Sequence, residues 1–143
     1  MGNVLSIHVS AERGIIKTDV AEVKVLEGWG LEGDAHGGDW DRQVSVFPIE
    51  AMARVPEEKR AEVSADGYTE NFTISGLLLE DFPAGCVLKL GEAEIEILYI
   101  GKEVFKEKGR PYIVSREGRF GRVLRGGSVR IGDFVEVIFL PET

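Results

Sequence analysis

The sequence predicts a mainly β protein that folds into a closed or nearly closed β-barrel with one or two short helices. Short segments rich in β-branched residues recur along the 143 residues, and 18 glycines provide tight turns between them. No low-complexity linker divides the chain, and its length suits a single domain, residues 1–143.

Six segments have the β-branched or alternating composition that is typical of strands. The Gly91-Glu92 pair predicts a hairpin with one solvated face, and a similar turn at Gly132-Asp133 precedes the last segment. The two turns have similar sequences before them, and Ser128 stands before the second turn where Cys86 stands before the first. This parallel predicts that Cys86 has a structural position at the start of a strand. The six segments are Val4–Val9, Val20–Leu26, Gln43–Phe47, Cys86–Leu90, Glu94–Ile100 and Phe134–Leu140.

Two segments have features of helices. The apolar residues of Ile49–Val55, just after Pro48, are spaced for a helix. A second helix would begin at Ser115, a candidate N-cap, and end at the glycine pair 126–127. The apolar side of this second helix would consist of Phe120, Val123 and Leu124.

Arg116 would lie in the first turn of that second helix, where the helix dipole attracts anions. Backbone N–H groups together with a guanidinium fork suit an oxyanion or a phosphate. The alternative is an amphipathic surface helix without a ligand.

The formal net charge is −8, which argues against a general nucleic-acid-binding protein. Basic residues nevertheless gather between Lys102 and Arg130, where nine Lys or Arg stand against three Asp or Glu. A basic segment in an acidic protein predicts a local site for a small anion, and the alternative is a solvated basic face.

Cys86 is the only cysteine, so the chain forms no internal disulfide and no cysteine-based metal site. It lies between Gly85 and Val87, which predicts a buried thiol that acts as a small hydrophobic side chain rather than a sulfur carrier. With no apolar run of membrane-spanning length and no signal peptide, we expect a cytoplasmic protein that does not associate with membranes.

Residues 28–33 match the dinucleotide-binding pattern G-x-G-x-x-G, but no helical pattern follows them, so we predict a glycine-rich loop rather than a dinucleotide site. The loop continues with four residues that could surround a metal ion, namely Asp34, His36, Asp39 and Asp41. We predict no metal site, and expect these residues to cap turns and to orient Arg42.

Two short polar patterns lie on expected strands. Gln43 and Ser45 share one face, with Arg42 at the loop edge, and Asn71 and Thr73 share a face of another strand. Either pair could serve a ligand, or simply face the solvent.

Taken together, these stretches resemble the MOSC domain, which forms the C-terminus of molybdenum-cofactor sulfurases and also occurs as a free-standing prokaryotic protein. The resemblance covers nearly the whole chain. The residues that carry it are Gly30–His36, Arg42–Ser45, Glu70–Thr73 with Gly76, Ile100–Glu103, Arg116–Gly118, Phe120, Arg122–Gly127 and Gly132-Asp133.

The resemblance implies a barrel related to the pyruvate-kinase barrel domain, with a pocket for molybdenum cofactor (molybdopterin). It further implies molybdenum-ion binding and a link with pyridoxal-phosphate proteins. The ligand-binding positions that match the family are Arg42, Gln43, Ser45, Asn71, Thr73, Arg116 and Arg122, and the supporting loop positions are Gly33, Asp34, His36 and Gly37. Val104 stands where the family has its sulfur-carrying cysteine.

The chain is therefore expected to bind molybdenum cofactor, or a similar anionic pterin or phosphate ligand, as a carrier or sensor without cysteine-based sulfur transfer. One alternative is a sulfurtransferase that uses Cys86 or the persulfide of a partner, such as a cysteine desulfurase, with a molybdoenzyme as acceptor. A second alternative is a non-catalytic interaction domain.

Overall fold

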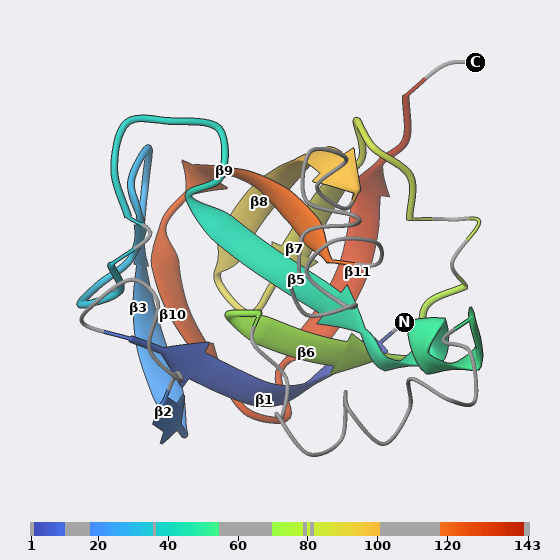
Figure 1. Cartoon of the computed structure of the whole chain (residues 1–143), viewed down its shortest axis with the longest axis horizontal. Helices are drawn as coiled ribbons and strands as arrows, with labels where there is room; N and C mark the ends of the chain where they lie inside the picture. The colour runs from blue at the N-terminus through green and yellow to red at the C-terminus, as the bar shows by residue number, and fades with distance from the viewer. Residues whose placement is uncertain are drawn as a thin grey trace, which may run out of the picture.

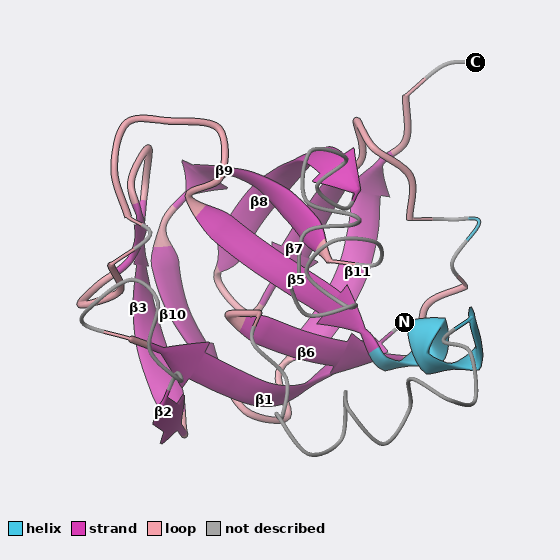
Figure 2. Ribbon diagram, in the orientation of Figure 1, coloured by secondary structure: helices cyan, strands magenta, loops and turns pink. Residues whose placement is uncertain are grey.

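The structure is a computed structural model that describes residues 2–10, 18–35, 37–54, 70–78, 80, 82–100 and 118–141. These residues contain eleven strands and one 3-10 helix, η1 (Ile49–Arg54) (Figure 2). The strands are β1 (Gly2–Val9), β2 (Thr18–Val20), β3 (Glu22–Leu26), β4 (Gly30–Leu31), β5 (Val44–Pro48), β6 (Phe72–Ser75), β7 (Val87–Leu90), β8 (Ala93–Ile100), β9 (Arg119–Arg125), β10 (Gly127–Arg130) and β11 (Phe134–Phe139).

Seven strands form a closed barrel (Figure 1). Their order is β11-β7-β8-β9-β5-β6-β1, and β1 pairs again with β11 to complete the ring. The β5–β6 pair is parallel, and the other six pairs in the ring are antiparallel. β2 pairs with β1 outside the ring, and β10, β3 and β4 form a separate small sheet. This architecture confirms the predicted barrel.

The core fills the inside of this ring, because every second residue of a strand points inward. Each fully buried aliphatic or aromatic side chain contributes about 1.5–3 kcal/mol relative to an exposed one. The interior side chains from the seven strands include Val4, Ile7, Val44, Val46, Phe72, Ile74, Leu88, Leu90, Ile95, Ile97, Val123 and Val135.

The predicted hairpin at Gly91-Glu92 is confirmed, since it joins the antiparallel pair β7 and β8. Along β8 the half-buried Glu94 and Glu96 alternate with buried isoleucines, which gives the one solvated face that the sequence predicts. The turn at Gly132 has a different role. It connects β10 to β11, and these two strands belong to different sheets.

The predicted helix from Ser115 to the glycine pair is wrong over its described part, because residues 119–125 form β9 between β5 and β8. A Cβ atom at Gly121 would overlap the carbonyl oxygen of Glu96, so this close approach of β8 and β9 requires glycine at position 121. The glycine pair does not end a helix, since its second residue opens β10. Arg116 lies outside the described residues.

The other predicted helix is confirmed in short form by η1, and residue 55 lies outside the described part. Among the helices that are described, none is long and apolar enough to cross a membrane.

Candidate functional site

Five side chains, four from neighbouring strands and one from Asn71 directly before β6, form a row on the outer face of the barrel. Ser45 pairs with Phe120, and Phe120 pairs with Tyr99. On the other side, the backbone N–H of His8 donates to the carbonyl of Asn71, whose side chain contacts Ser45. Because directly paired residues point to the same face of a sheet, the row runs across β1, β6, β5, β9 and β8.

Asn71 and Ser45, which the sequence places in the ligand pocket, bind each other. The Ser45 backbone N–H and Oγ donate to Asn71 Oδ1 at 3.0 and 3.2 Å, and the Asn71 backbone N–H donates to Ser45 Oγ at 2.9 Å. Asn71 Nδ2 donates to the carbonyl of His8 at 3.1 Å. The pair therefore joins three strands and forms the polar floor of the outer face.

Thr73 lies on the same face of β6 as Asn71, as the sequence predicts, and only 1% of the residue is exposed. Its Oγ1 is buried and has no hydrogen-bond partner within the part of the chain that the structure describes. A buried hydroxyl without a partner costs about 1–3 kcal/mol, so such a group needs an explanation such as a ligand or a water molecule.

Gln43 is fully buried and holds backbone groups rather than facing a pocket. Its Nε2 donates to the carbonyls of Gly28 and Gly38 at 2.8 and 2.9 Å, and its Oε1 accepts from the N–H of Val123 at 3.0 Å. Both amide hydrogens are thus used, and the side chain fixes the glycine-rich loop to β9.

The glycine-rich loop has the structural role that the sequence predicts. No helix follows it in residues 37–48. At Gly30, with φ 136°, an added Cβ would lie 2.6 Å from the carbonyl oxygen of Gln43, so the backbones touch there. Asp34 Oδ1 accepts from the Ser10 N–H at 2.9 Å and so supports the loop.

Of the other predicted loop residues, Gly33 has φ 82° and a Cβ at Gly37 would meet the ring of Trp29. His36 lies outside the described residues.

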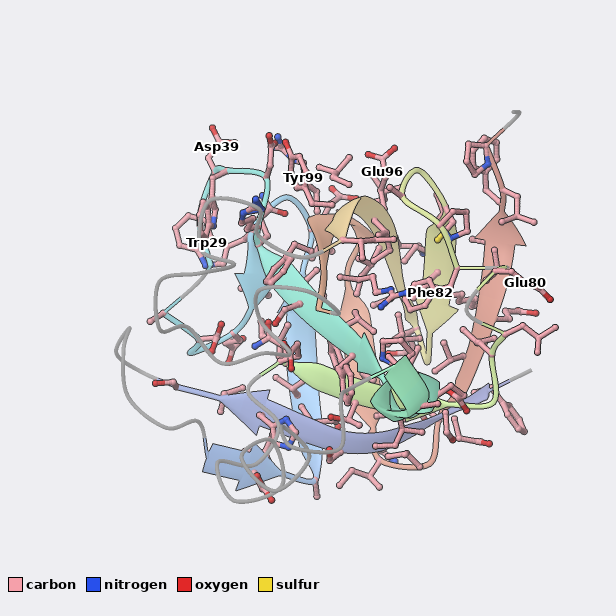
Figure 3. All side chains as sticks on the ribbon, turned by 45° about the vertical axis from the view of Figure 1, so that its right-hand side comes forward. Trp29, Asp39, Glu80, Phe82, Glu96 and Tyr99 are labelled. Carbon is pink, nitrogen blue, oxygen red and sulfur yellow. The ribbon has the colours of Figure 1, made fainter. Side chains whose placement is uncertain are left out.

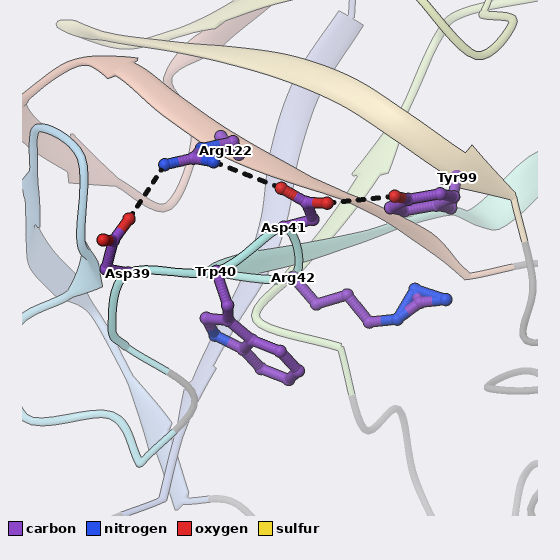
Figure 4. Close-up of a pocket in the computed structure, with 6 residues that line it drawn as sticks. All are labelled: Asp39, Trp40, Asp41, Arg42, Tyr99 and Arg122. Carbon is purple, nitrogen blue, oxygen red and sulfur yellow. Dashed lines mark hydrogen bonds and ion pairs between the residues drawn. The ribbon is translucent and has the colours of Figure 1, made fainter.

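Residues from the end of this loop, β8 and β9 line a pocket of about 500 Å³ that is open to solvent (Figure 4). One side is an ion-pair network, in which Arg122 Nη2 lies 3.2 Å from Asp39 Oδ1 and Arg122 Nη1 lies 3.1 Å from Asp41 Oδ1. The Tyr99 hydroxyl donates to Asp41 Oδ2 at 3.1 Å. Figure 3 shows Asp39 and Tyr99 on the same rim of the barrel. The lining residues are Asp39, Trp40, Asp41, Arg42, Tyr99 and Arg122.

Arg42 is the cation in this pocket that has no acidic partner among the described residues. Its guanidinium carbon lies 4.5 Å from the centre of the Tyr99 ring and 5.3 Å from that of Phe120. Its Nη1 is buried and has no hydrogen-bond partner in the described part of the chain. A guanidinium that is stacked on rings and still has a free N–H group is suited to binding an oxyanion.

The described arginines of the basic segment do not form an exposed anion-binding face. Arg125 Nη1 lies 3.5 Å from Glu94, and Arg130 Nε lies 3.3 Å from Glu22. Arg119 points into the barrel, where it is 2% exposed and stacks on the Phe82 ring at 5.2 Å. Arg42, which lies outside that segment, differs from these described arginines because it lines the pocket of about 500 Å³ and has no acidic partner among the described residues.

Cys86 is completely buried in the core, directly before β7, as the sequence predicts. Burial raises its pKa to about 11, although the charge of Arg119 partly opposes this shift. The thiol is therefore protonated at neutral pH and inaccessible, whereas a sulfur carrier needs an exposed thiolate. Val104, at the family's cysteine position, lies outside the described residues.

Within the described ranges, no group of three or more His, Cys, Asp or Glu side chains is placed to hold a metal ion. Asp39 and Asp41 pair with Arg122 rather than with Arg42, so the prediction that they orient Arg42 is wrong for these two residues. Sequence reasoning missed the aromatic part of the pocket, Trp40 and Tyr99. A register shift between Ile97 and Tyr99 places Tyr99 beside Phe120, and strand alternation alone does not predict that shift.

Comparison with known proteins agrees with this fold. Residues 32–99 match the model of the MOSC domain family. The uncharacterized protein YflK of Bacillus subtilis (strain 168) is 32% identical over 92 residues, which are 60% of this chain. The chain covers only 41% of the length of that relative.

Solved structures show the same fold at lower sequence identity. The YUAD protein from Bacillus subtilis is 17% identical with a TM-score of 0.68, and the match covers 96% of each chain. YiiM from Geobacillus stearothermophilus is 21% identical with a TM-score of 0.66, over 97% of this chain and 76% of that one. Residues 32–99 therefore match a MOSC domain, and the barrel has the same fold as these solved structures.

Proposed function

We propose that this MOSC domain binds molybdenum cofactor, or a similar anionic pterin or phosphate ligand, as a carrier or sensor. The observation that carries the proposal is Arg42, whose buried Nη1 has no partner in the described residues at the edge of a pocket of about 500 Å³. That volume is within the range of about 300–1,000 Å³ that is usual for small-molecule sites.

The residues present fit such a ligand. Arg42 would bind the phosphate or oxyanion through its guanidinium fork. Trp40 and Tyr99 offer aromatic surfaces to a planar ring. When bound, molybdenum cofactor supplies a metal centre for oxygen-atom and electron transfer, and this chain's residues hold and orient it.

The other predicted ligand contacts take indirect roles in this proposal. Gln43 fixes the loop that ends in Arg42, and Asn71 with Ser45 keeps the outer face of the three strands rigid. Arg122 is already held by Asp39 and Asp41. Arg42 is therefore the residue on which ligand affinity should depend most.

Sulfur transfer through Cys86 is not supported, because its thiol is buried and its pKa is raised to about 11. Any sulfur would have to come from a partner's persulfide. A cysteine desulfurase or a molybdoenzyme remains the proposed class of partner, as donor or acceptor for the bound cofactor.

An anaerobic titration with molybdenum cofactor, followed by tryptophan fluorescence, tests the proposal, because Trp40 lines the pocket. We expect saturable quenching, and at least about tenfold weaker binding for Arg42→Ala, since a charge-assisted contact contributes about 1.5–3 kcal/mol. Arg130→Ala is the matched control, because Arg130 pairs with Glu22 on the small sheet. Equal affinity of Arg42→Ala and wild type, or no quenching of the folded protein, would overturn the proposal.

A further inference from the structure

The pocket contains as many carboxylates as guanidinium groups. Arg122 lies between Asp39 and Asp41, and each carboxylate contacts a different nitrogen of its guanidinium (Figure 4). Arg42 has no such acidic partner among the described residues, and it stacks on rings instead. The formal charges of these four side chains cancel, although the pocket offers one cation whose donors are not all used.

We infer that Asp39 and Asp41 are specificity-determining residues, which favour ligands whose phosphate part is a single phosphate and disfavour polyphosphates. This inference rests on the proposed function of the same pocket. A single phosphate can be bound by the guanidinium fork of Arg42 alone. A chain of phosphates that extends from Arg42 along the pocket toward Arg122 would meet the two carboxylates, or would have to displace both of them from Arg122.

The exposure of these groups determines how large the effect can be. The side chains of Asp39, Asp41 and Arg122 are 92%, 51% and 38% exposed, so water and salt screen their charges. Their influence on a ligand is consequently strongest at low ionic strength. An ion-pair network with a purely structural role would not change the preference between short and long anions.

The test compares orthophosphate with tripolyphosphate as probes, at low ionic strength, in wild type and in the double variant Asp39→Asn/Asp41→Asn. The variant keeps similar side-chain shapes and removes two negative charges. We expect the affinity for tripolyphosphate to rise about tenfold and that for orthophosphate less than about threefold, because Coulomb energy grows with the charge of the ligand. The difference between wild type and the double variant in tripolyphosphate affinity should become smaller at 0.15 M salt, where the screening length is about 8 Å.

The matched control is Glu22→Gln/Glu94→Gln, which removes two carboxylates that pair with Arg130 and Arg125 and do not line this pocket. It makes the same change in net charge and should change either affinity less than about twofold. An equal rise for both probes, an equal rise in the control, or no rise for tripolyphosphate would overturn the inference.

The two proposals can fail separately. If Arg42→Ala weakens cofactor binding while the double variant leaves the phosphate selectivity unchanged, only the role of Asp39 and Asp41 is wrong. If wild type and Arg42→Ala show the same response to cofactor, the proposed function itself is wrong, whatever the phosphate titrations give.

Discussion

The two faces of the barrel wall at β5, β6 and β9 have opposite characters. On the inner face, side chains such as Val46, Phe72 and Val123 are apolar and fully packed. On the outer face, Ser45, Asn71 and Thr73 are polar and still largely buried. At these positions the inner face carries no polar group, and Arg119 of β9, which also points inward, stacks on the Phe82 ring. The outer face keeps Thr73 Oγ1 without a partner among the described residues.

This contrast separates stability from binding within the same strands. Burial of apolar area on the inner face stabilises the fold regardless of ligand. Buried hydrogen-bonding groups without a partner on the outer face do not stabilise the fold. Such groups are typical of positions that are retained for function at a cost in stability. Substitutions on the two faces should therefore have effects of different size, and at one position of different sign.

The largest expected effect concerns adjacent residues on opposite faces. Phe72→Ala should lower the free energy of unfolding by about 4 kcal/mol, because it removes a fully buried ring and leaves a cavity. Asn71→Ala should lower it by about 2 kcal/mol through lost hydrogen bonds. Urea denaturation measures both, and a larger loss for Asn71→Ala would contradict the assignment of stability to the inner face.

A smaller effect, with a defined pH dependence, is expected at Cys86 on the inner face. The folded state raises the pKa of this thiol from 9.0 to about 11, so the folded state holds the proton more tightly than the unfolded state. The stabilisation is complete below pH 9 and is lost as the pH rises toward 11.

The measurement for Cys86 is the difference in unfolding free energy between wild type and Cys86→Ala at several pH values. Between pH 8 and pH 10, wild type should lose about 1 kcal/mol more than the variant. Because lysines and tyrosines titrate in both proteins, subtracting the Cys86→Ala value from the wild-type value at each pH removes their contribution. Parallel pH profiles would show that the thiol titrates normally.

The smallest effect is expected at Thr73 on the outer face, and its sign is reversed. Thr73→Val should raise the free energy of unfolding by up to about 1 kcal/mol in ligand-free protein, because it replaces a buried hydroxyl without a partner by a methyl group. Thr73→Ser keeps the hydroxyl and should be slightly destabilising. A clear loss of stability in Thr73→Val would mean that the hydroxyl is satisfied in solution.

The sequence was sufficient to predict the barrel, the Gly91-Glu92 hairpin and the buried Cys86, since these follow from alternation and turn composition over short distances. It also placed Asn71 and Thr73 on one face. It did not predict β9, because the serine before this segment and the glycines after it imitate helix caps. The period-2 burial of Gly121 and Val123 is visible only once β8 and β5 lie on either side.

The pocket was predicted less completely than the fold. Arg42 was identified from its position at a loop edge, but its stacking on Tyr99 and Phe120 depends on pairings between distant strands. The role of Gln43 likewise depends on contacts with residues 15 and 80 positions away. Hydrogen-bonding capacity is visible in a sequence, whereas the identity of the partner is not.

The ring of strands is closed by its first and last members, since Asn3 pairs with Phe134 and Gly2 with Val135. During synthesis from the N-terminus, β1 therefore cannot pair with β11 until nearly the whole domain has been synthesised. Closing such a long loop has a large entropic cost and is typical of slow-folding topologies. A ribosome-bound chain that lacks β11 would expose the edges of β1 and β7, and these edges are the sites at which a nascent-chain chaperone would be most useful.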